Sequence, residues 1–466
     1  MGGNGAMINN FSSDTFKGNI FNENLLNELS VVAEKNNYID PIYYSKYDVK
    51  RGLRNENGTG VLVGLTEIGN VHGYITSDGK RIPDQGRLDY RGIDIMKVVE
   101  GFQSENRYGF EEVAYLLLFG ELPSKKRLEE FKYLLGECRI LPDGFTEDMI
   151  LKFPSNNIMN KLQRTVLATY SFDSNPDDTR IKNILRQSIE LIARFPTMIS
   201  YGYQAKAHYH GNQSLFLHIP KQELSTAENI LYMIRSDNQY TKTEAEILDL
   251  ALVLHAEHGG GNNSAFATHV VSSSGTDTYS AIAAAVGSLK GPKHGGANLE
   301  VMNMMDNIKE NIKNWDNTGE IRDYLIKILN KKAFNGTGLI YGMGHAIYTL
   351  SDPRAVLLKE KAKQLAKEKD RLEEFNLYNN IEEISKAIFA ELRGNDSISA
   401  NVDFYSGFVY DMLNIPRELY TPLFATSRVS GWCAHRIEQV ASEPKIIRPA
   451  YKNIKLDEKY IPLDNR

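Results

Sequence analysis

Apolar residues recur at helical spacing through most of the chain beyond residue 90, which predicts a mainly α-helical fold. The expected helices cover residues 111–119, 124–135, 160–170, 181–193, 247–254, 279–289, 298–305, 353–370, 381–392, 403–416 and 422–439. The alternation of strands and helices that builds a dinucleotide-binding sheet is missing, so that fold is not expected.

The first ninety residues follow a different pattern. Residues 8–48 are polar apart from a helical patch at 25–34. Residues 61–63 and 73–76 are β-prone, and Asp78-Gly79 is a hairpin turn signal. We therefore expect a small N-terminal β-hairpin region ahead of the helices.

Two of the expected helices should lie in the core. Residues 247–254 are apolar nearly all round, follow a capping-box pattern at 243–246, and end where His255 and His258 stand. Residues 279–289 are rich in alanine, and Gly291-Pro292 ends that helix just before His294. A rigid buried helix with a functional loop at its tip is a common way to build a site.

Length and composition narrow the class of protein. The chain has 466 residues, more than one ordinary core accommodates, so two lobes are expected. The 54 basic and 59 acidic residues leave a net charge of -5, which gives no support for a nucleic-acid partner or an acidic membrane surface. No apolar run approaches the roughly 18 residues that span a membrane.

The expected compartment is the cytoplasm. The two cysteines, Cys138 and Cys433, exclude a disulfide framework and favour a reducing compartment. The N-terminal residues contain no apolar secretory segment, and acidic residues such as Glu23 and Glu28 argue against a transit peptide.

The stretch from His255 to Asn262 is the first candidate for chemistry. His255 and His258 could chelate a metal ion with Glu257 or His269, His258 could be a structural histidine, or it could meet an anion beside the glycine loop. The His-Glu-x-x-His zinc signature is absent, which weakens the metal interpretation.

The stretch Gly291-Pro-Lys-His294-Gly-Gly-Ala-Asn298 is the second candidate. His294 is either a plain turn residue or a histidine at the N-terminus of the next helix. The positive potential at a helix N-terminus lowers the pKa of a histidine. Such a neutral ring can donate a hydrogen bond to a developing oxyanion.

A glycine-rich stretch from Gly336 to His345 is the third candidate, because its four glycines in nine positions suggest backbone folded closely around a ligand. Asp352-Pro353 downstream is a helix-start pattern. Arg354 then stands in the first helical turn, where it is either a surface residue or a bidentate partner for a carboxylate.

Two further motifs lie near the C-terminus. In Asn401-Val-Asp403-Phe-Tyr-Ser-Gly407, Asp403 is either a helix cap or a general base in an apolar pocket. In the stretch from Phe424 to Gly431, Arg428 interrupts an apolar helix, and an arginine is seldom buried without an anionic partner.

In this order, the motifs resemble the citrate synthase family over about residues 86–448. GPKHGGAN, GMGHAIY with DPRA, NVDFYSG and SRVSG are each weak but together highly specific. The resemblance implies a two-lobed, all-helical fold with an N-terminal extension at 1–44, a large lobe at 45–297 and 413–466, and a small lobe at 298–412. It also implies a homodimer with active sites shared between subunits.

The resemblance assigns a role to individual residues, position by position. His294, His345 and Asp403 match the catalytic trio. The oxaloacetate and citrate ligands match His258, Arg354, Arg428 and Arg448, the last donated by the other subunit, and Phe424 matches an aromatic residue of the product pocket. The coenzyme A contacts match Leu339, Ile340, Gly342, Gly344, Ala346 and Asn401.

The implied reaction condenses acetyl-CoA with oxaloacetate and then hydrolyses citryl-CoA. Asp403 takes the methyl proton, neutral His294 meets the charge on the thioester oxygen, and His345 polarises the ketone of oxaloacetate. Closure of the small lobe over the large one then excludes water. No metal or other cofactor is expected.

Three alternatives remain open. The first is 2-methylcitrate synthase, which would use propionyl-CoA with the same residues. The second is a metal-dependent hydrolase built on His255, His258 and His269, and the third is an inactive acyl-CoA-binding homologue. Two departures from the family pattern bear on substrate choice: many bacterial members have arginine where Ala346 stands, and Lys293 occupies a position that is often small or apolar.

Overall fold

The computed structural model describes residues 23–394, 397–442 and 445–466. It divides into two units, one comprising the N-terminal residues through Leu62 together with Arg448–Arg466, and the other comprising Val63–Ile447.

The first unit consists of short helices and extended chain. Its helical elements are α1 (Glu23–Asn37), α2 (Ile42–Lys46), η1 (Arg51–Leu53) and η5 (Leu463–Asn465). The helical patch expected at 25–34 lies within α1. The strand expected at 61–63 does not form, because these residues have no partner strand and Leu62 is 87% exposed.

The second unit is mainly helical, as the apolar spacing predicts. Its elements are β1 (Gly69–Ser77), β2 (Lys80–Tyr90), β3 (Ile93–Asp94), α3 (Ile95–Ser104), α4 (Phe110–Phe119), α5 (Lys125–Cys138), η2 (Thr146–Leu151), α6 (Ile158–Thr169), η3 (Tyr170–Phe172), α7 (Ile181–Gly211), α8 (Thr226–Ile234), α9 (Lys242–His255), α10 (Asn263–Ser272), α11 (Thr278–Lys290), α12 (Ala297–Asn311), α13 (Thr318–Leu329), α14 (Pro353–Glu368), α15 (Leu372–Arg393), α16 (Val402–Met412), η4 (Arg417–Leu419) and α17 (Tyr420–Ala441).

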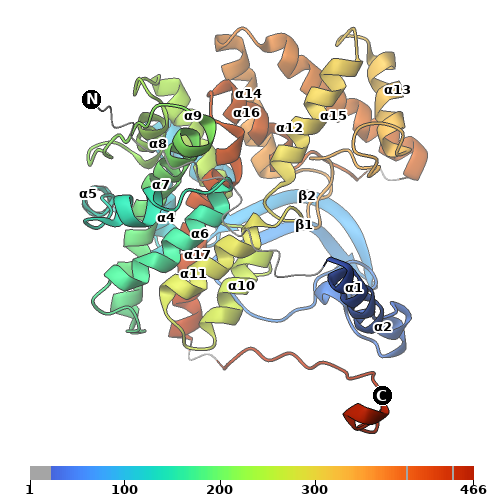
Figure 1. Cartoon of the computed structure of the whole chain (residues 1–466). Helices are drawn as coiled ribbons and strands as arrows, with labels where there is room; N and C mark the ends of the chain where they lie inside the picture. Colours follow the sequence, from blue (N-terminus) through green and yellow to red (C-terminus); the bar gives the residue numbers. More distant parts are fainter. Residues whose placement is uncertain (1–22, 395–396, 443–444) are drawn as a thin grey trace, which may run out of the picture. The chain divides into compact units, whose positions relative to one another are not determined.

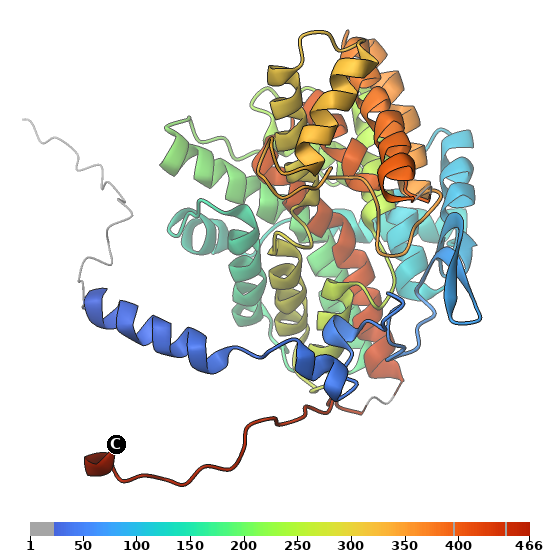
Figure 2. The same cartoon turned by 90° about the vertical axis from the view of Figure 1, so that its right-hand side faces the viewer.

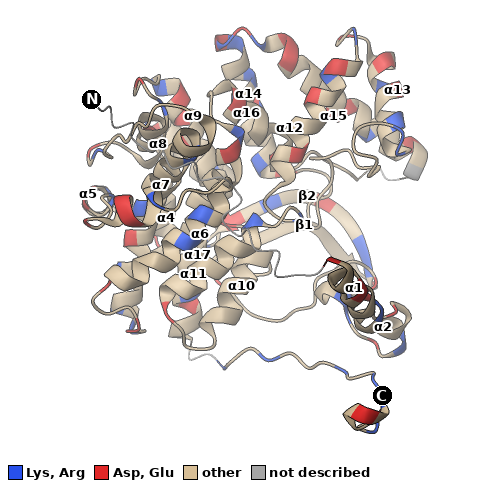
Figure 3. Ribbon diagram, viewed as in Figure 1, with Lys and Arg blue, Asp and Glu red and all other residues tan. Residues whose placement is uncertain are grey.

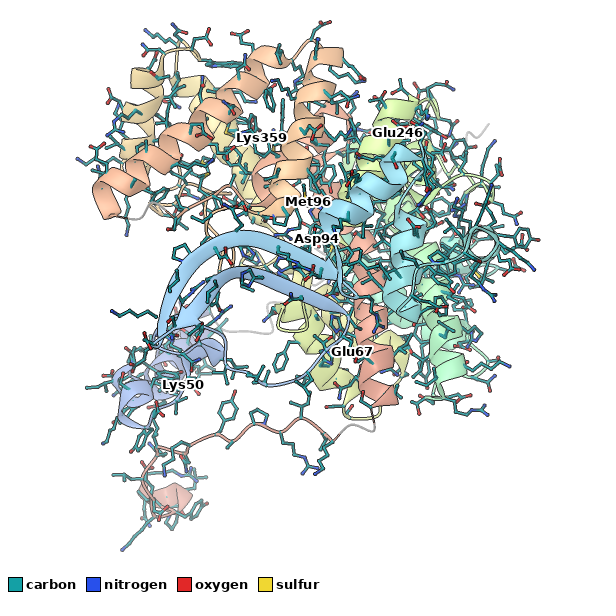
Figure 4. The ribbon with its side chains drawn as sticks, turned by 180° about the vertical axis from the view of Figure 1, so that it is seen from behind. Lys50, Glu67, Asp94, Met96, Glu246 and Lys359 are labelled. Atoms are coloured by element: carbon teal, nitrogen blue, oxygen red, sulfur yellow. The ribbon has the colours of Figure 1, made fainter. Side chains whose placement is uncertain are left out.

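The strands form a three-stranded antiparallel sheet in the order β1-β2-β3, and β1 and β2 form the expected hairpin. Its two-residue turn has positive φ at both Asp78 (51°) and Gly79 (73°), the combination that a type I′ turn requires. At the other end of the hairpin, the Asp94 side chain accepts a hydrogen bond of 2.8 Å from the amide of Met96 and so begins α3 (Figure 4).

Helix α17 is the centre of one helical group. It packs against α4, α7, α9, α10 and α11 (Figure 1). Its Trp432, Arg428 and Arg436 are among the largest fully buried side chains. Helix α9 beside it is also buried, as expected. Its capping box is Thr241 with Glu244 rather than 243–246, because the Glu244 carboxylate accepts from the Thr241 amide at 3.0 Å.

A second helical group contains α12 to α16. Within it, α14 packs on α15 and α16, α12 packs on α16, and α13 packs on α15 (Figure 2). Contacts of α14 with α3, α9 and β2, and of α12 with α17, join this group to the first. Both signs of charge occur on α13, α14 and α15 (Figure 3), with Lys and Arg prevailing in the sequence of α14 and Glu in that of α15.

Two helices are longer than their sequence patterns predict. Helix α7 continues through Pro196 to Gly211, although proline removes one backbone donor. Pro196 lies within the helix and is buried, as are its neighbours Phe195 and Thr197. Helix α15 begins at Leu372 rather than at the predicted residue 381. Its first turns bury Phe375, Leu377 and Tyr378, but polar residues between them obscure this apolar face in the sequence. Among the described residues, no helix is long and apolar enough to cross a membrane.

Candidate active site

Helices and loops of the second unit bring six of the predicted site residues together. His258 follows α9, His294 lies between α11 and α12, and His345 lies in the loop before α14. Arg354 and Asp403 stand in the first turns of α14 and α16, and Arg428 lies within α17. The rings of His258 and His345 are 5.1 Å apart between centroids, and the charges of both arginines act on His258 and on Asp403.

Arg428 is the most unusual group in this site. Its side chain is only 1% exposed, and Nη1 and Nη2 have no hydrogen-bond partner among the described residues. Nε donates to the carbonyl of His255 at 2.6 Å, and Cζ lies 4.7 Å from the centroid of the Phe424 ring. Burial lowers the pKa of Arg428 to about 10. Burying a guanidinium whose two terminal nitrogens have no partner costs free energy, so the geometry indicates that an anionic ligand binds there.

Arg354 is held in place by its own helix cap. Asp352 caps α14 and binds Arg354 through two contacts, 3.0 Å to Nε and 2.7 Å to Nη2. The Asp352 carboxylate also accepts from the amide of Val402 at 3.2 Å and so ties the start of α14 to the start of α16. Burial by itself would lower the pKa of Arg354, but the negative charge and hydrogen bonds of Asp352 act against it, and the pKa is raised.

His258 and His345 are both kept neutral, for different reasons. Burial first, and then the guanidinium of Arg354, lower the pKa of His258 well below its usual range, and its Nε2 has no partner among the described residues. Nδ1 of His345 accepts hydrogen bonds from the amides of Ile347 and Tyr348 at 3.1 and 3.2 Å. An Nδ1 that accepts carries no proton, so the neutral ring of His345 holds its proton on Nε2.

The main influence on the pKa of His294 is not the helix N-terminus that the sequence suggested. Burial, followed by the charge of Arg428, lowers the pKa of His294 to about 4. Its Nε2 lies 3.0 Å from Oγ of Ser264, whose oxygen also accepts from Nε1 of Trp432 at 3.1 Å. The sequence motifs did not single out Ser264, which is a polar residue that no local pattern distinguishes.

Asp403 is available for chemistry because another residue performs the capping. The Asn401 side chain accepts from the amide of Asp403 at 3.0 Å and so caps α16. The Asp403 carboxylate is half-buried, and loss of hydration raises its pKa to about 6, against the charge of Arg354. A carboxylate with this pKa is ionised at neutral pH and still basic enough to accept a proton.

Glu257 and His435 form a buried ion pair behind the His258 loop, which the sequence motifs did not reveal. Nε2 of His435 lies 3.0 Å from Oε1 of Glu257, and both residues are fully buried. The same carboxylate accepts from the amide of Gly259, directly after His258. Burial alone would lower the pKa of His435, but Glu257 overrides this and raises it to about 9.

One group of possible metal ligands occurs among the described residues, and it differs from the trio considered above. It contains His269, His435 and Glu438, whereas His255 donates through Nδ1 to the carbonyl of Ala251 at 2.7 Å. Nε2 of His269 lies 3.1 Å from Nδ1 of His435, so these two nitrogens already share a hydrogen bond.

The predicted coenzyme contacts lie along one loop and the start of α16. Gly342 and Gly344 have φ of 79° and 86°, which explains the glycines there. Nδ2 of Asn401 donates to the carbonyl of Gly344 at 2.8 Å, so the loop is fixed to α16. Leu339 is 53% exposed, whereas Ile340 is buried. Arg448 belongs to the first unit, and its predicted role remains a prediction.

The chain is similar to known proteins over most of its length. The family model for the citrate synthase C-terminal domain matches residues 57–450. Citrate synthase of Synechocystis is 37% identical over 78% of this chain and 84% of its own, and 2-methylcitrate synthase 1 of Corynebacterium glutamicum is 32% identical over 84% and 95%. A ternary complex of Thermoplasma acidophilum citrate synthase with carboxymethyl coenzyme A and oxaloacetate is similar with a TM-score of 0.71 and 26% identity, covering 89% of this chain and 98% of that one.

Proposed function

The chain belongs to the citrate synthase family, enzymes that transfer an acyl group and form citrate, and on that premise we propose that it condenses acetyl-CoA with oxaloacetate. Water then hydrolyses the citryl-CoA intermediate to citrate and CoA. The observation that carries the proposal is that Arg428 is buried with Nη1 and Nη2 unpartnered among the described residues. It lies in one site with Arg354, His258 and Asp403.

Oxaloacetate is a ligand that these groups fit. Its two carboxylates need cationic partners, and Arg428 offers two unpartnered nitrogens while Arg354 supplies a second buried charge. Nε2 of His258 adds an unsatisfied polar atom beside them. The proton that neutral His345 carries on Nε2 would polarise the ketone of oxaloacetate, because a hydrogen bond there draws charge from the carbon under attack.

The acyl-CoA half of the reaction requires a base and an oxyanion donor. Asp403, with its pKa of about 6, would remove a proton from the methyl group, and neutral His294 would donate to the thioester oxygen as charge develops on it. The new carbon–carbon bond forms between this enolate carbon and the polarised ketone. Every step uses side chains of the chain and the two substrates, so we propose no metal or other cofactor.

A second candidate is 2-methylcitrate synthase, because a relative with that name is 32% identical to this chain. Propionyl-CoA would use the same base and donors, and the extra methyl group would have to fit beside them. We favour acetyl-CoA because the Synechocystis relative, which is named citrate synthase, is 37% identical to this chain, whereas the 2-methylcitrate synthase is 32% identical.

We further propose a homodimer in which Arg448 reaches the partner's site, and a small lobe at 298–412 that closes over the rest. The mutual packing of α12 to α16 supports this lobe. The cytoplasm remains the proposed compartment, supported by the two free cysteines, Cys138 and Cys433.

The test is Asp403→Asn, which keeps the shape of the side chain and removes the base. We expect kcat to fall by about 10² to 10⁴ while the Kd for oxaloacetate, measured by calorimetry, changes little. In the wild type, kcat/KM for acetyl-CoA should decline below about pH 6, because the protonated carboxyl cannot accept a proton. A kcat for the variant within about threefold of wild type would show that Asp403 is not the base.

A further inference from the structure

Arg81, at the start of β2, is the cation that the hairpin presents to the predicted coenzyme loop. Nη2 donates to the carbonyl of Ala346 at 3.0 Å, and Cζ lies 3.8 Å from the centroid of the Tyr74 ring. None of the carboxylates in the described part of the chain forms an ion pair with Arg81. Its guanidinium is therefore held by a carbonyl and a ring, with its charge uncompensated.

The hairpin that carries Arg81 is fixed to the segment after His345. Oγ1 of Thr349 contacts the carbonyl of Gly73 and accepts from the amide of Asp84 at 3.1 Å. The amide of Gly86 donates to Oγ of Ser351 at 3.0 Å. A side-chain carbon at Gly73 would lie 2.6 Å from the carbonyl oxygen of Ile347, so the two backbones are in direct contact. The position of Arg81 beside the loop is thus built into the fold.

The loop itself lacks positive charge. Residues 336–346 contain no lysine or arginine. An acyl-CoA carries its charge on the phosphates of its nucleotide half, and phosphates are commonly held by arginine. The guanidinium of Arg81, only a hydrogen bond away from the backbone of Ala346, supplies this missing charge from a distant part of the chain.

We propose that Arg81 binds a phosphate group of the acyl-CoA substrate, a proposal that rests on the proposed function. Stacking on Tyr74 fixes the plane of the guanidinium before the ligand arrives, so little side-chain entropy remains to be lost on binding. The bond to Ala346 occupies one hydrogen of Nη2 and leaves the remaining N–H groups of the half-buried side chain for phosphate oxygens.

The first measurement compares Arg81→Gln with Lys80→Gln. Glutamine at 81 keeps a donor for the Ala346 carbonyl and removes the charge. Lys80 is the adjacent, exposed cation and serves as the matched control. We expect Arg81→Gln to raise KM for acetyl-CoA about tenfold with kcat within about twofold of wild type, and Lys80→Gln to change neither by more than about twofold. An unchanged KM in Arg81→Gln would overturn the proposal.

A phosphate-free substrate separates charge recognition from a structural role. Acetyl-pantetheine retains the thioester and lacks the phosphates, so wild type and Arg81→Gln should use it with equal kcat/KM. If Arg81→Gln is about tenfold worse on acetyl-pantetheine as well, Arg81 acts by holding the loop, and the phosphate contact is wrong.

Calorimetric binding of free CoA keeps this test independent of turnover. Arg81→Gln should bind CoA about tenfold more weakly than wild type, whatever reaction the enzyme catalyses. If wild type binds CoA more tightly than Arg81→Gln but forms no citrate, the result would support the Arg81 contact and contradict the proposed function. Equal CoA affinity in the two proteins would contradict the Arg81 contact and leave the proposed function intact.

Discussion

At the scale of single residues, the site depends on polar groups whose partners lie far away in the sequence. His435 is one of them, because it pairs with Glu257, which lies 178 positions away and binds the amide of Gly259 directly after His258. The charged and titratable groups that face His435 are Glu257, Glu438 and His269. Protonated His435 compensates the buried charge of Glu257.

This pair predicts a pH-dependent stability. The pKa of His435 is raised to about 9 in the folded chain, against an ordinary value of about 6.5 for an unfolded histidine. Its contribution to stability is therefore complete below about pH 6.5 and is lost as pH rises through about 9. His435→Gln should be less stable than wild type in urea at pH 6.5, and the difference should shrink by pH 10. A difference independent of pH over this range would mean that His435 is neutral in the folded protein.

At the scale of elements, the β1–β2 hairpin fixes the backbone between His345 and Arg354. Gly73 and Gly86 of the hairpin allow the two backbones to approach closely. A side-chain carbon at Gly86 would collide with the backbone carbonyl of Ser351, whereas one at Gly101 in α3 would meet no atom within 4 Å. Gly86→Ala should displace the segment and lower kcat/KM by about tenfold or more, since misplacement of about 1 Å can cost about 10² in rate. Gly101→Ala is the matched control, and should keep full activity and gain about 0.5–1 kcal/mol in stability. Equal activity in the two variants would show that the hairpin does not position the loop.

Most of the helices and the hairpin could be predicted from the sequence, because they depend on local patterns of apolar and turn residues. The apolar run of α9 and the small residues of α11 mark buried helices, and His294 follows α11 as expected. Two predictions differ from the structure for reasons that local sequence does not contain. Helix α7 continues past Pro196 to Gly211, and the β-prone residues 61–63 form no strand because none lies beside them.

The parts of the site that could not be predicted are contacts between distant residues. The Arg81 bond to Ala346 spans 265 positions, and the His435 bond to Glu257 spans 178. The cause of the low pKa of His294 was also beyond local reasoning, because burial depends on packing of the whole unit. The resemblance supplied roles for residues, whereas the fold supplies the reasons that they are neutral, charged or unpaired.

At the scale of the whole molecule, the proposed dimer makes each site depend on two chains. If Arg448 serves the partner's site, Asp403→Asn and Arg448→Ala chains are each nearly inactive alone. In a mixed dimer, one site receives both defects and the other receives neither. Random pairing makes half of the dimers mixed, so refolding an equal mixture should restore roughly a quarter of wild-type activity. Activity that stays at the parental level, with mixed dimers demonstrated in the sample, would mean that Arg448 does not act across the interface.

The central claim is the condensation of acetyl-CoA with oxaloacetate, and the most direct test is a pair of kcat/KM values for the wild-type protein. Acetyl-CoA and propionyl-CoA are each supplied with oxaloacetate, and the products are identified. We predict citrate as the product from acetyl-CoA, with a kcat/KM at least about tenfold above that for propionyl-CoA, because one methylene in a fitted pocket discriminates by about 10- to 200-fold. A higher value for propionyl-CoA, with 2-methylcitrate as the product, or no condensation with either thioester, would contradict the claim.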